Sequence, residues 1–293
     1  MAGDVYYSGE RIARADFDRG AKQLAADMIE RGLKPDDCIA ISMRNDPVYL
    51  QLIIAARYVG VRFAMINWHS APLEVQHILE DSGAKLLYAH SDLLSSMTGH
   101  VPDQTASISV PVPGPVAKAY NTQDVPVDWA TPVEQIFANA APYEGDPKKL
   151  RGMFAYTSGS TGRPKGIKRI TAADGPDMWD RYIGLSQVLM GAEPGDRIHI
   201  SAPLYHSAPN ALSTISLSTN YVDIFLEPKF DSEVFLESIH TAKITHAYVV
   251  PTMMIRMLKL GPQIREKYDV SSLKWALTTG SPFPMDIKRP MID

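Results

Sequence analysis

The sequence predicts an α/β protein with two doubly wound sheets, which are parallel sheets covered by helices on both faces. Short apolar strands alternate with amphipathic helices at intervals of roughly 20 to 25 residues, as parallel βαβ units require. The alternation occurs twice, before residue 98 and after residue 197. With 293 residues, of which 45% are hydrophobic, the chain can bury a core without disulfides.

The first series of elements occupies residues 17–89. Apolar residues recur at helical spacing from Phe17 to Ile29. Asp46 and Pro47 then supply a cap and a first-turn proline to a second helix. The expected elements are a helix at 17–29, a strand at 38–43, a helix at 47–59, a strand at 63–66, a helix at 73–80 and a strand at 86–89.

Between Thr98 and Lys149 the pattern fades. Eight prolines interrupt this segment, and no helical periodicity is visible in it. We expect a long irregular excursion over the surface, without a functional site.

The alternation resumes after Arg197. Ligands of doubly wound sheets bind outside the carboxyl ends of the strands, so the loops at those ends are where a site is expected. Strands are expected at 197–201, 221–226, 245–250 and 273–277, with helices that begin near Ser207, Asp231 and Pro251.

Composition excludes several classes of protein. Lys and Arg total 29 against 33 Asp and Glu, a net charge of −4, which argues against a nucleic-acid or anionic-membrane binder. The most apolar stretch, 48–66, contains Gln51, Arg57 and Arg62, so no membrane span is expected. The first residues do not resemble a secretory leader, and the one cysteine, Cys38, suits a reducing compartment. We expect a cytoplasmic protein.

One segment carries the chemistry, from Tyr156 to Gly166. Glycines let a backbone approach an anion, hydroxyls add donors, and Lys165 adds a positive charge, so the segment suits a polyphosphate. Its glycine spacing and the strand expected after Lys165 differ from a P-loop, which excludes a P-loop kinase or GTPase. The expected geometry is strand, loop, strand. The segment contains Thr157, Ser158, Gly159, Ser160, Thr161 and Gly162 besides Lys165 and Gly166.

This segment resembles the phosphate loop of the adenylate-forming superfamily, which includes acyl-CoA synthetases, luciferases and peptide-synthetase adenylation domains. Residues 203–210 resemble the second motif of that family, an aromatic and histidine element beside the carboxylate. Residues 230–252 resemble the stretch that lines the acyl pocket, and residues 273–284 resemble the strand and turn against adenine. Within the superfamily, fatty and related acyl-CoA synthetases are the most similar.

The resemblance implies ATP-dependent activation of a carboxylic acid to acyl-AMP, followed by thioester formation with coenzyme A. ATP, Mg²⁺ and coenzyme A are the expected cofactors, a fatty or other hydrophobic acid is the expected substrate, and no residue is assigned as a protein metal ligand. Lys165 and His206 are the expected catalytic residues. The expected nucleotide contacts are residues 157–162, Lys165, Gly280, Ser281 and Pro282, and the expected substrate contacts are Tyr205, His206, Tyr248 and Thr252.

The resemblance also implies a domain plan. Residues 1–150 would form a first lobe, 151–170 the phosphate-binding hairpin, and 171–293 an incomplete second lobe. The metal-binding Glu, the ribose-binding Asp and the C-terminal lid domain of the family do not occur before Asp293. We therefore expect the front part of the AMP-binding domain, with little or no activity alone. Two alternatives remain: a non-catalytic nucleotide-binding module, or an adenylation domain for another acid.

Overall fold

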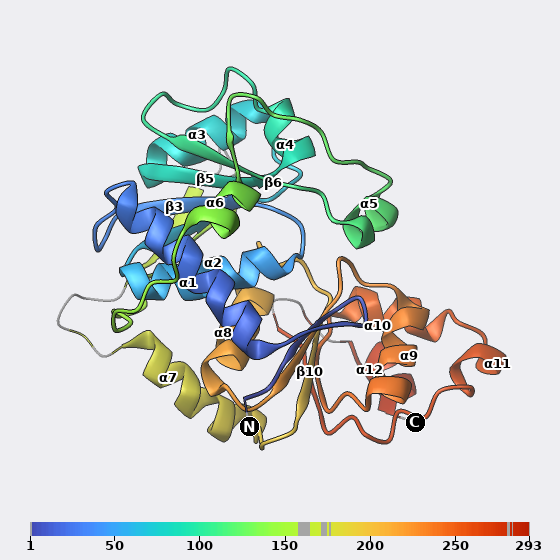
Figure 1. Ribbon diagram of the computed structural model, residues 1–293. Helices are drawn as coiled ribbons and strands as arrows, with labels where there is room; N and C mark the ends of the chain where they lie inside the picture. The colour runs from blue at the N-terminus through green and yellow to red at the C-terminus, as the bar shows by residue number, and fades with distance from the viewer. Residues whose placement is uncertain are drawn as a thin grey trace.

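The computed structural model describes residues 2–157, 165–170, 175, 177–279, 282 and 284–292. In this part of the chain, two sheets lie on either side of a layer formed by helices α1, α2 and α8 (Figure 1). The strand orders are β7-β6-β5-β3-β4-β8-β9 and β13-β12-β10-β11-β1-β2. The prediction of two doubly wound, largely parallel sheets is confirmed.

The first sheet is parallel except at its last pair, in which β8 and β9 are antiparallel. Its central strands are buried on both faces, which explains their continuous apolar sequences. Its strands are β3 (Cys38–Ser42), β4 (Arg62–Met65), β5 (Ala84–His90), β6 (Ala106–Val110), β7 (Thr131–Pro132), β8 (Gly152–Thr157) and β9 (Lys165–Ile170). Its helices are α1 (Arg14–Glu30), α2 (Pro47–Val59), α3 (Pro72–Ser82), α4 (Ser91–Ser96), α5 (Gly114–Tyr120) and α6 (Val133–Asn139).

Helix α2 begins where the sequence predicts. The Asp46 side chain accepts a hydrogen bond from the backbone N–H of Val48 at 2.7 Å, and Pro47 occupies the first turn. Gly60 ends the helix with φ of 79°, a left-handed conformation that favours glycine. These local signals set where α2 begins and ends, and nine of its residues are buried in the layer between the sheets.

The prediction of an irregular excursion at 98–149 is wrong. Strands β6 and β7 extend the sheet there, and helices α5 and α6 follow them. Pro113, Pro115 and Pro132 lie at helix starts, where a missing N–H costs nothing, and the other five prolines of this segment lie outside the helices. Pro113 and Pro132 are the N-cap residues of α5 and α6.

The second sheet contains two strands from the start of the chain. Strand β1 pairs in parallel with β11, with Val5 opposite Ile224, and β2 pairs antiparallel with β1. The expected first lobe at 1–150 is therefore corrected at its beginning, since residues 5–12 belong to the second sheet. The strands of this sheet are β1 (Val5–Tyr7), β2 (Glu10–Ile12), β10 (Arg197–Ile200), β11 (Asp223–Leu226), β12 (His246–Tyr248) and β13 (Trp275–Leu277).

The helices of the second lobe begin close to the expected positions. Asp231 caps α9 by accepting hydrogen bonds from two backbone N–H groups, and Pro251 begins α10. In the part of the chain that is described, no helix is both long and apolar enough to cross a bilayer. These helices are α7 (Met178–Leu185), with the π-helical segment η1 (Ser186–Met190), then α8 (Ser207–Thr219), α9 (Ser232–Ala242), α10 (Pro251–Leu258), α11 (Pro262–Arg265) and α12 (Met285–Ile292).

Candidate active site

The carboxyl ends of the two sheets meet at Asn45, which follows β3 and is 2% exposed. Its side-chain amide donates hydrogen bonds to the carbonyl oxygens of Ala202 and Glu227, both at 3.0 Å. Its side-chain oxygen accepts a hydrogen bond from the backbone N–H of Leu204 at 2.9 Å. Because Ala202 and Leu204 follow β10 and Glu227 follows β11, Asn45 joins the strand ends of one sheet to a strand end of the other.

The turn after β10 is held from two more directions. The carbonyl oxygen of Leu204 accepts hydrogen bonds from the Tyr49 hydroxyl at 3.2 Å and from the Asn210 side-chain amide at 3.1 Å. Both donors are fully buried, so water does not compete for these bonds. The backbone that leads to His206 is therefore fixed by buried hydrogen bonds.

A cleft of about 780 Å³ lies outside the carboxyl ends of β10, β12 and β13. This is the position at which doubly wound sheets bind ligands. Three of the four expected substrate residues line this cleft: His206, Tyr248 and Thr252. Thr279, from the segment that resembles the family's adenine-contacting turn, lines it as well. The other described lining residues are small or apolar: Ala202, Pro203, Ser207, Ala208, Pro209, Ala211, Val250 and Met253.

Tyr205, the fourth expected substrate residue, is not among the described residues that line the cleft. Its ring packs against His206, with the centroids 4.2 Å apart and 44° between the planes. Burial raises the pKa of Tyr205. Although the His206 side chain keeps contact with solvent, the surrounding cleft atoms lower its pKa by desolvation. At neutral pH His206 is therefore a neutral imidazole, which can donate one hydrogen bond and accept another.

The beginning of α8 forms one wall of the cleft. His206 is its N-cap residue, and residues 207–209 of the first turn line the cavity. A helix N-terminus carries a partial positive charge, so this wall favours an anionic group such as a carboxylate or a phosphate. On the opposite side, the Tyr248 hydroxyl donates a hydrogen bond to the carbonyl oxygen of Thr279 at 3.3 Å, which ties β12 to the residues after β13.

The hydroxyl-rich hairpin leaves the carboxyl edge of the first sheet. Thr157 ends β8, which runs parallel to β4, and the exposed Lys165 begins β9 directly opposite it. The predicted strand, loop, strand geometry is confirmed in the described parts of both strands. Ser158, Gly159, Ser160, Thr161, Gly162, Gly280 and Ser281 lie outside the described residues, while Pro282 is described and exposed.

The base of the hairpin is closely packed. The Tyr156 hydroxyl donates a hydrogen bond to the Asp81 carboxylate at 2.7 Å, and burial raises the pKa of Tyr156. A Cβ atom at Gly166 would lie 3.0 Å from the Tyr156 ring and 3.2 Å from an Asp81 oxygen. Glycine at this position therefore lets β9 approach Tyr156 and the end of α3.

The described residues contain no group of three or more His, Cys, Asp or Glu side chains that could hold a metal ion. The Mg²⁺ expected with ATP stays a prediction.

Sequence reasoning missed the residues that position the turn. The sequence motifs assign no role in the site to Asn45 or Tyr49, and Asn210 is included only as the last residue of the family-like segment 203–210. A signal for Asn45 existed in its place after a buried strand, at the edge where ligands of doubly wound sheets bind. Its partners could not be read from the sequence, because all three are backbone groups.

Two doubly wound sheets, with a cleft and a glycine-rich hairpin at their carboxyl edges, define the class of this domain: it has the fold of the N-terminal domain of adenylate-forming enzymes. A family model described as "AMP-binding enzyme" matches residues 4–293. The chain belongs to this family.

Individual relatives are similar at moderate identity. The chain is 25% identical over 294 residues to a feruloyl-CoA synthase from Amycolatopsis sp, covering 99% of this chain and 53% of that protein. It is 28% identical over 272 residues to a 2-succinylbenzoate–CoA ligase from Bacillus licheniformis, and the match covers 91% of this chain and 49% of that protein. The chain thus spans about half the length of these curated relatives.

A solved structure gives the same fold. The inhibitor-bound N-terminal domain of FACL13 from Mycobacterium tuberculosis superposes with a TM-score of 0.77 at 20% identity. The match covers 99% of this chain and 69% of that one. At this identity the likeness concerns the fold alone.

Proposed function

We propose that this chain is the acid- and nucleotide-binding part of an enzyme that activates a carboxylic acid with ATP and then forms a thioester with coenzyme A. The observation that carries the proposal is the cleft of about 780 Å³ at the carboxyl ends of β10, β12 and β13, lined by His206, Tyr248 and Thr252. Membership of the AMP-binding family supports ATP as the co-substrate.

In the first half-reaction, a carboxylate oxygen of the acid attacks the α-phosphorus of ATP. A carboxylate–phosphorus bond forms, the bond to the bridging oxygen of the leaving group breaks, and pyrophosphate departs with that electron pair. The first turn of α8 would favour the anionic carboxylate, and neutral His206 would orient it through a hydrogen bond. Lys165 would offset the charge that develops on the leaving pyrophosphate.

We propose further that the acid has a hydrophobic, aromatic body. Among the described residues that line the cleft, none carries an Asp, Glu, Lys or Arg side chain, and most are alanine, proline, valine or methionine. An apolar acid binds favourably to such a wall because binding removes apolar surface from water. The wall offers no opposite charge to a second ionic group on the acid. The feruloyl-CoA synthase described above is named for an acid that carries an aromatic ring and a single carboxyl group.

The test is acid-dependent release of pyrophosphate. The intact protein is given Mg²⁺, ATP and a panel of hydroxycinnamic, aryl-substituted and saturated fatty acids. Release with an aryl acid would support the proposal, and release with fatty acids alone would contradict its substrate part. No release with any acid, together with retained ATP binding, would favour the alternative of a non-catalytic nucleotide-binding module.

Lys165→Ala tests the role of the hairpin. Losing one preorganised charge at a developing anion costs about 3 kcal/mol of transition-state stabilisation, so the rate of acid-dependent pyrophosphate release should fall about 100-fold. Lys267→Ala, which removes an exposed lysine that does not line the cleft, is the matched control and should leave the rate unchanged. Equal rates for Lys165→Ala and the unmodified protein would refute the assigned role.

A further inference from the structure

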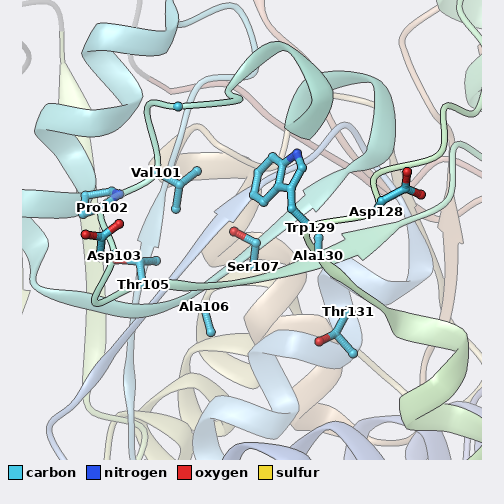
Figure 2. Close-up of a pocket in the computed structure, with 11 residues that line it drawn as sticks. Val101, Pro102, Asp103, Thr105, Ala106, Ser107, Asp128, Trp129, Ala130 and Thr131 are labelled. Atoms are coloured by element: carbon cyan, nitrogen blue, oxygen red, sulfur yellow. The ribbon is translucent and has the colours of Figure 1, made fainter.

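The segment 98–149, which was expected to be irregular and to carry no site, reaches two separate places. Parts of it line a surface cleft of about 490 Å³ beside β6 (Figure 2). Residues 120–122, at the end of α5, instead reach the carboxyl edge of the first sheet, where they contact Arg44 and Asp92. The hairpin extends from the same edge, so these contacts lie on the side of the sheet where chemistry is expected.

Arg44 follows β3, directly before Asn45, and forms a buried ion pair of two hydrogen bonds. Its Nη1 and Nη2 atoms donate to the two carboxylate oxygens of Asp92 at 3.0 and 2.9 Å. The Arg44 side chain is 7% exposed and the Asp92 side chain 13%. The Thr122 hydroxyl donates a further hydrogen bond to the Asp92 carboxylate at 2.7 Å. Paired bonds of this kind fix the plane of the guanidinium group as well as its position.

Two aromatic rings contact the same guanidinium group. Its central carbon lies 5.1 Å from the ring centre of Trp68, which follows β4, and 5.0 Å from the ring centre of Tyr120, the last residue of α5. The two rings meet edge to face, with their centroids 5.0 Å apart. Arg44 therefore holds Tyr120 against the ends of β3 and β4.

Tyr120 and Asn45 reach the second lobe at neighbouring residues. The Tyr120 hydroxyl donates a hydrogen bond to the carbonyl oxygen of Pro228 at 3.0 Å, and the Asn45 amide donates one to the carbonyl oxygen of Glu227 at 3.0 Å. Both acceptors follow β11. Because Arg44 precedes one donor in the chain and contacts the ring of the other, it positions both bonds to this turn.

The proposed reaction needs the two carboxyl edges at a fixed spacing. The hairpin that begins β9 with Lys165 extends from the first sheet, whereas the cleft with His206 lies at the edge of the second. The carboxylate of the acid must reach the α-phosphorus of the nucleotide, and a misplacement of about 1 Å can lower a rate about 100-fold. The relative position of the two edges therefore affects the rate of attack.

We propose that Arg44 is a positioning residue for acid activation, which holds the carboxyl edges of the two sheets at the spacing that the attack requires. Arg44 is not among the described residues that line the cleft, so it acts through Asn45 and Tyr120. This role rests on the function proposed above.

Acid-dependent pyrophosphate release by the intact protein tests this role. Arg44→Met leaves the Asp92 carboxylate without its ionic partner, so the thermal midpoint should fall by about 10 °C. Adding Asp92→Asn removes the unpaired charge, and this double variant should recover most of the midpoint. In both variants kcat should fall about tenfold or more. KM for the acid and for ATP should change less than about threefold, because each binding part stays intact within its own lobe.

Hydrogen exchange of backbone amides gives a readout that needs no activity. The N–H of Leu204 bonds to Asn45 Oδ1 at 2.9 Å, and the N–H of Thr245 bonds to the carbonyl oxygen of Arg197 at 2.9 Å, at the amino ends of β10 and β12. In the double variant the Leu204 amide should exchange about tenfold faster, while the Thr245 amide keeps its rate. A general loss of stability would accelerate both amides alike.

Arg151→Met is the matched control. Arg151 also forms an ion pair of two hydrogen bonds, with Asp36 at 2.8 and 2.9 Å, but at the amino edge of the first sheet. This change should lower the thermal midpoint and leave kcat and the exchange of the Leu204 amide unchanged.

Recovery of kcat together with the thermal midpoint in the double variant would overturn the role of Arg44, because the pair would then contribute stability alone. An unchanged exchange rate at Leu204, or an equal loss of kcat in Arg151→Met, would overturn it as well. No pyrophosphate release by the unmodified protein with any acid would instead count against the proposed function. Faster exchange at Leu204 would in that case still support the positioning of Asn45 by Arg44.

Discussion

Replacing Asn45 by alanine should destabilise the protein more than any surface amide substitution. The change removes three hydrogen bonds of 2.9 to 3.0 Å, two of them buried and one partly buried, and leaves the N–H of Leu204 and two carbonyl groups without those partners. A buried polar group left unsatisfied costs about 1 to 3 kcal/mol, and part of that cost is recovered by relaxation or entry of water. We therefore expect the free energy of unfolding to fall by about 3 kcal/mol.

Urea denaturation followed by tryptophan fluorescence measures this loss. With a denaturant dependence of about 3 kcal/mol per molar urea, the midpoint should fall by about 1 M. Tyr49→Phe should cost much less, since the carbonyl oxygen of Leu204 keeps its bond from Asn210. Asn139→Ala, at an exposed position, should change the free energy by less than about 0.5 kcal/mol. If Asn45→Ala shifted the midpoint no further than Asn139→Ala, the assigned role of Asn45 would be wrong.

Burial lowers the pKa of His199 to about 3, against about 6.5 in an unfolded chain. The unfolded state therefore binds the extra proton first, and stability should fall as the pH drops from 6.5 toward 3, by up to about 1.4 kcal/mol per unit. His199→Leu should flatten this dependence in urea titrations at several pH values, and an unchanged slope would contradict the explanation. Gly166→Ala should lower the free energy of unfolding by about 1 to 2 kcal/mol, because its Cβ meets Tyr156 and Asp81. Gly184→Ala, in an exposed helix position with open space around it, should instead stabilise by about 0.5 to 1 kcal/mol. Calorimetric melting of both glycine variants checks these opposite signs, and two shifts in the same direction would refute the packing argument.

The sequence predicts most of this fold because its central strands are buried on both faces. All five residues of β3 are buried, so the strand appears as a continuous apolar stretch, and the cap formed by Asp46 with Pro47 marks the next helix. Strand β6 escaped detection because Ser107 and Ser109 make it look polar, although four of its five residues are buried. Proline counts were misleading there, since their effect depends on their place within a helix.

The candidate site was predictable only where a local motif carries it. Residues 203–206 and Tyr248 with Thr252 lie in separate segments that the resemblance places at one site, and the structure brings His206, Tyr248 and Thr252 into one cleft. The role of Asn45 was not predictable, because its partners are backbone groups 157 to 182 residues away in the chain. The nucleotide contacts assigned to residues 157–162, Lys165, Gly280, Ser281 and Pro282 remain a prediction.

The pairing of β1 with β11 has a consequence for how the protein is made. The backbone N–H of Asp4 bonds to the Asp223 side chain, 219 positions further along the chain. At about 5 to 20 residues per second, a ribosome adds those positions in roughly 10 to 40 seconds, and throughout that time β1 lacks its partner strand β11. A polypeptide that starts at residue 171 would lack β1, so β11 would become an exposed edge strand that can pair with strands of other molecules. Expression of the second lobe alone should therefore yield aggregates, whereas co-expression with the missing N-terminal hairpin should restore soluble material.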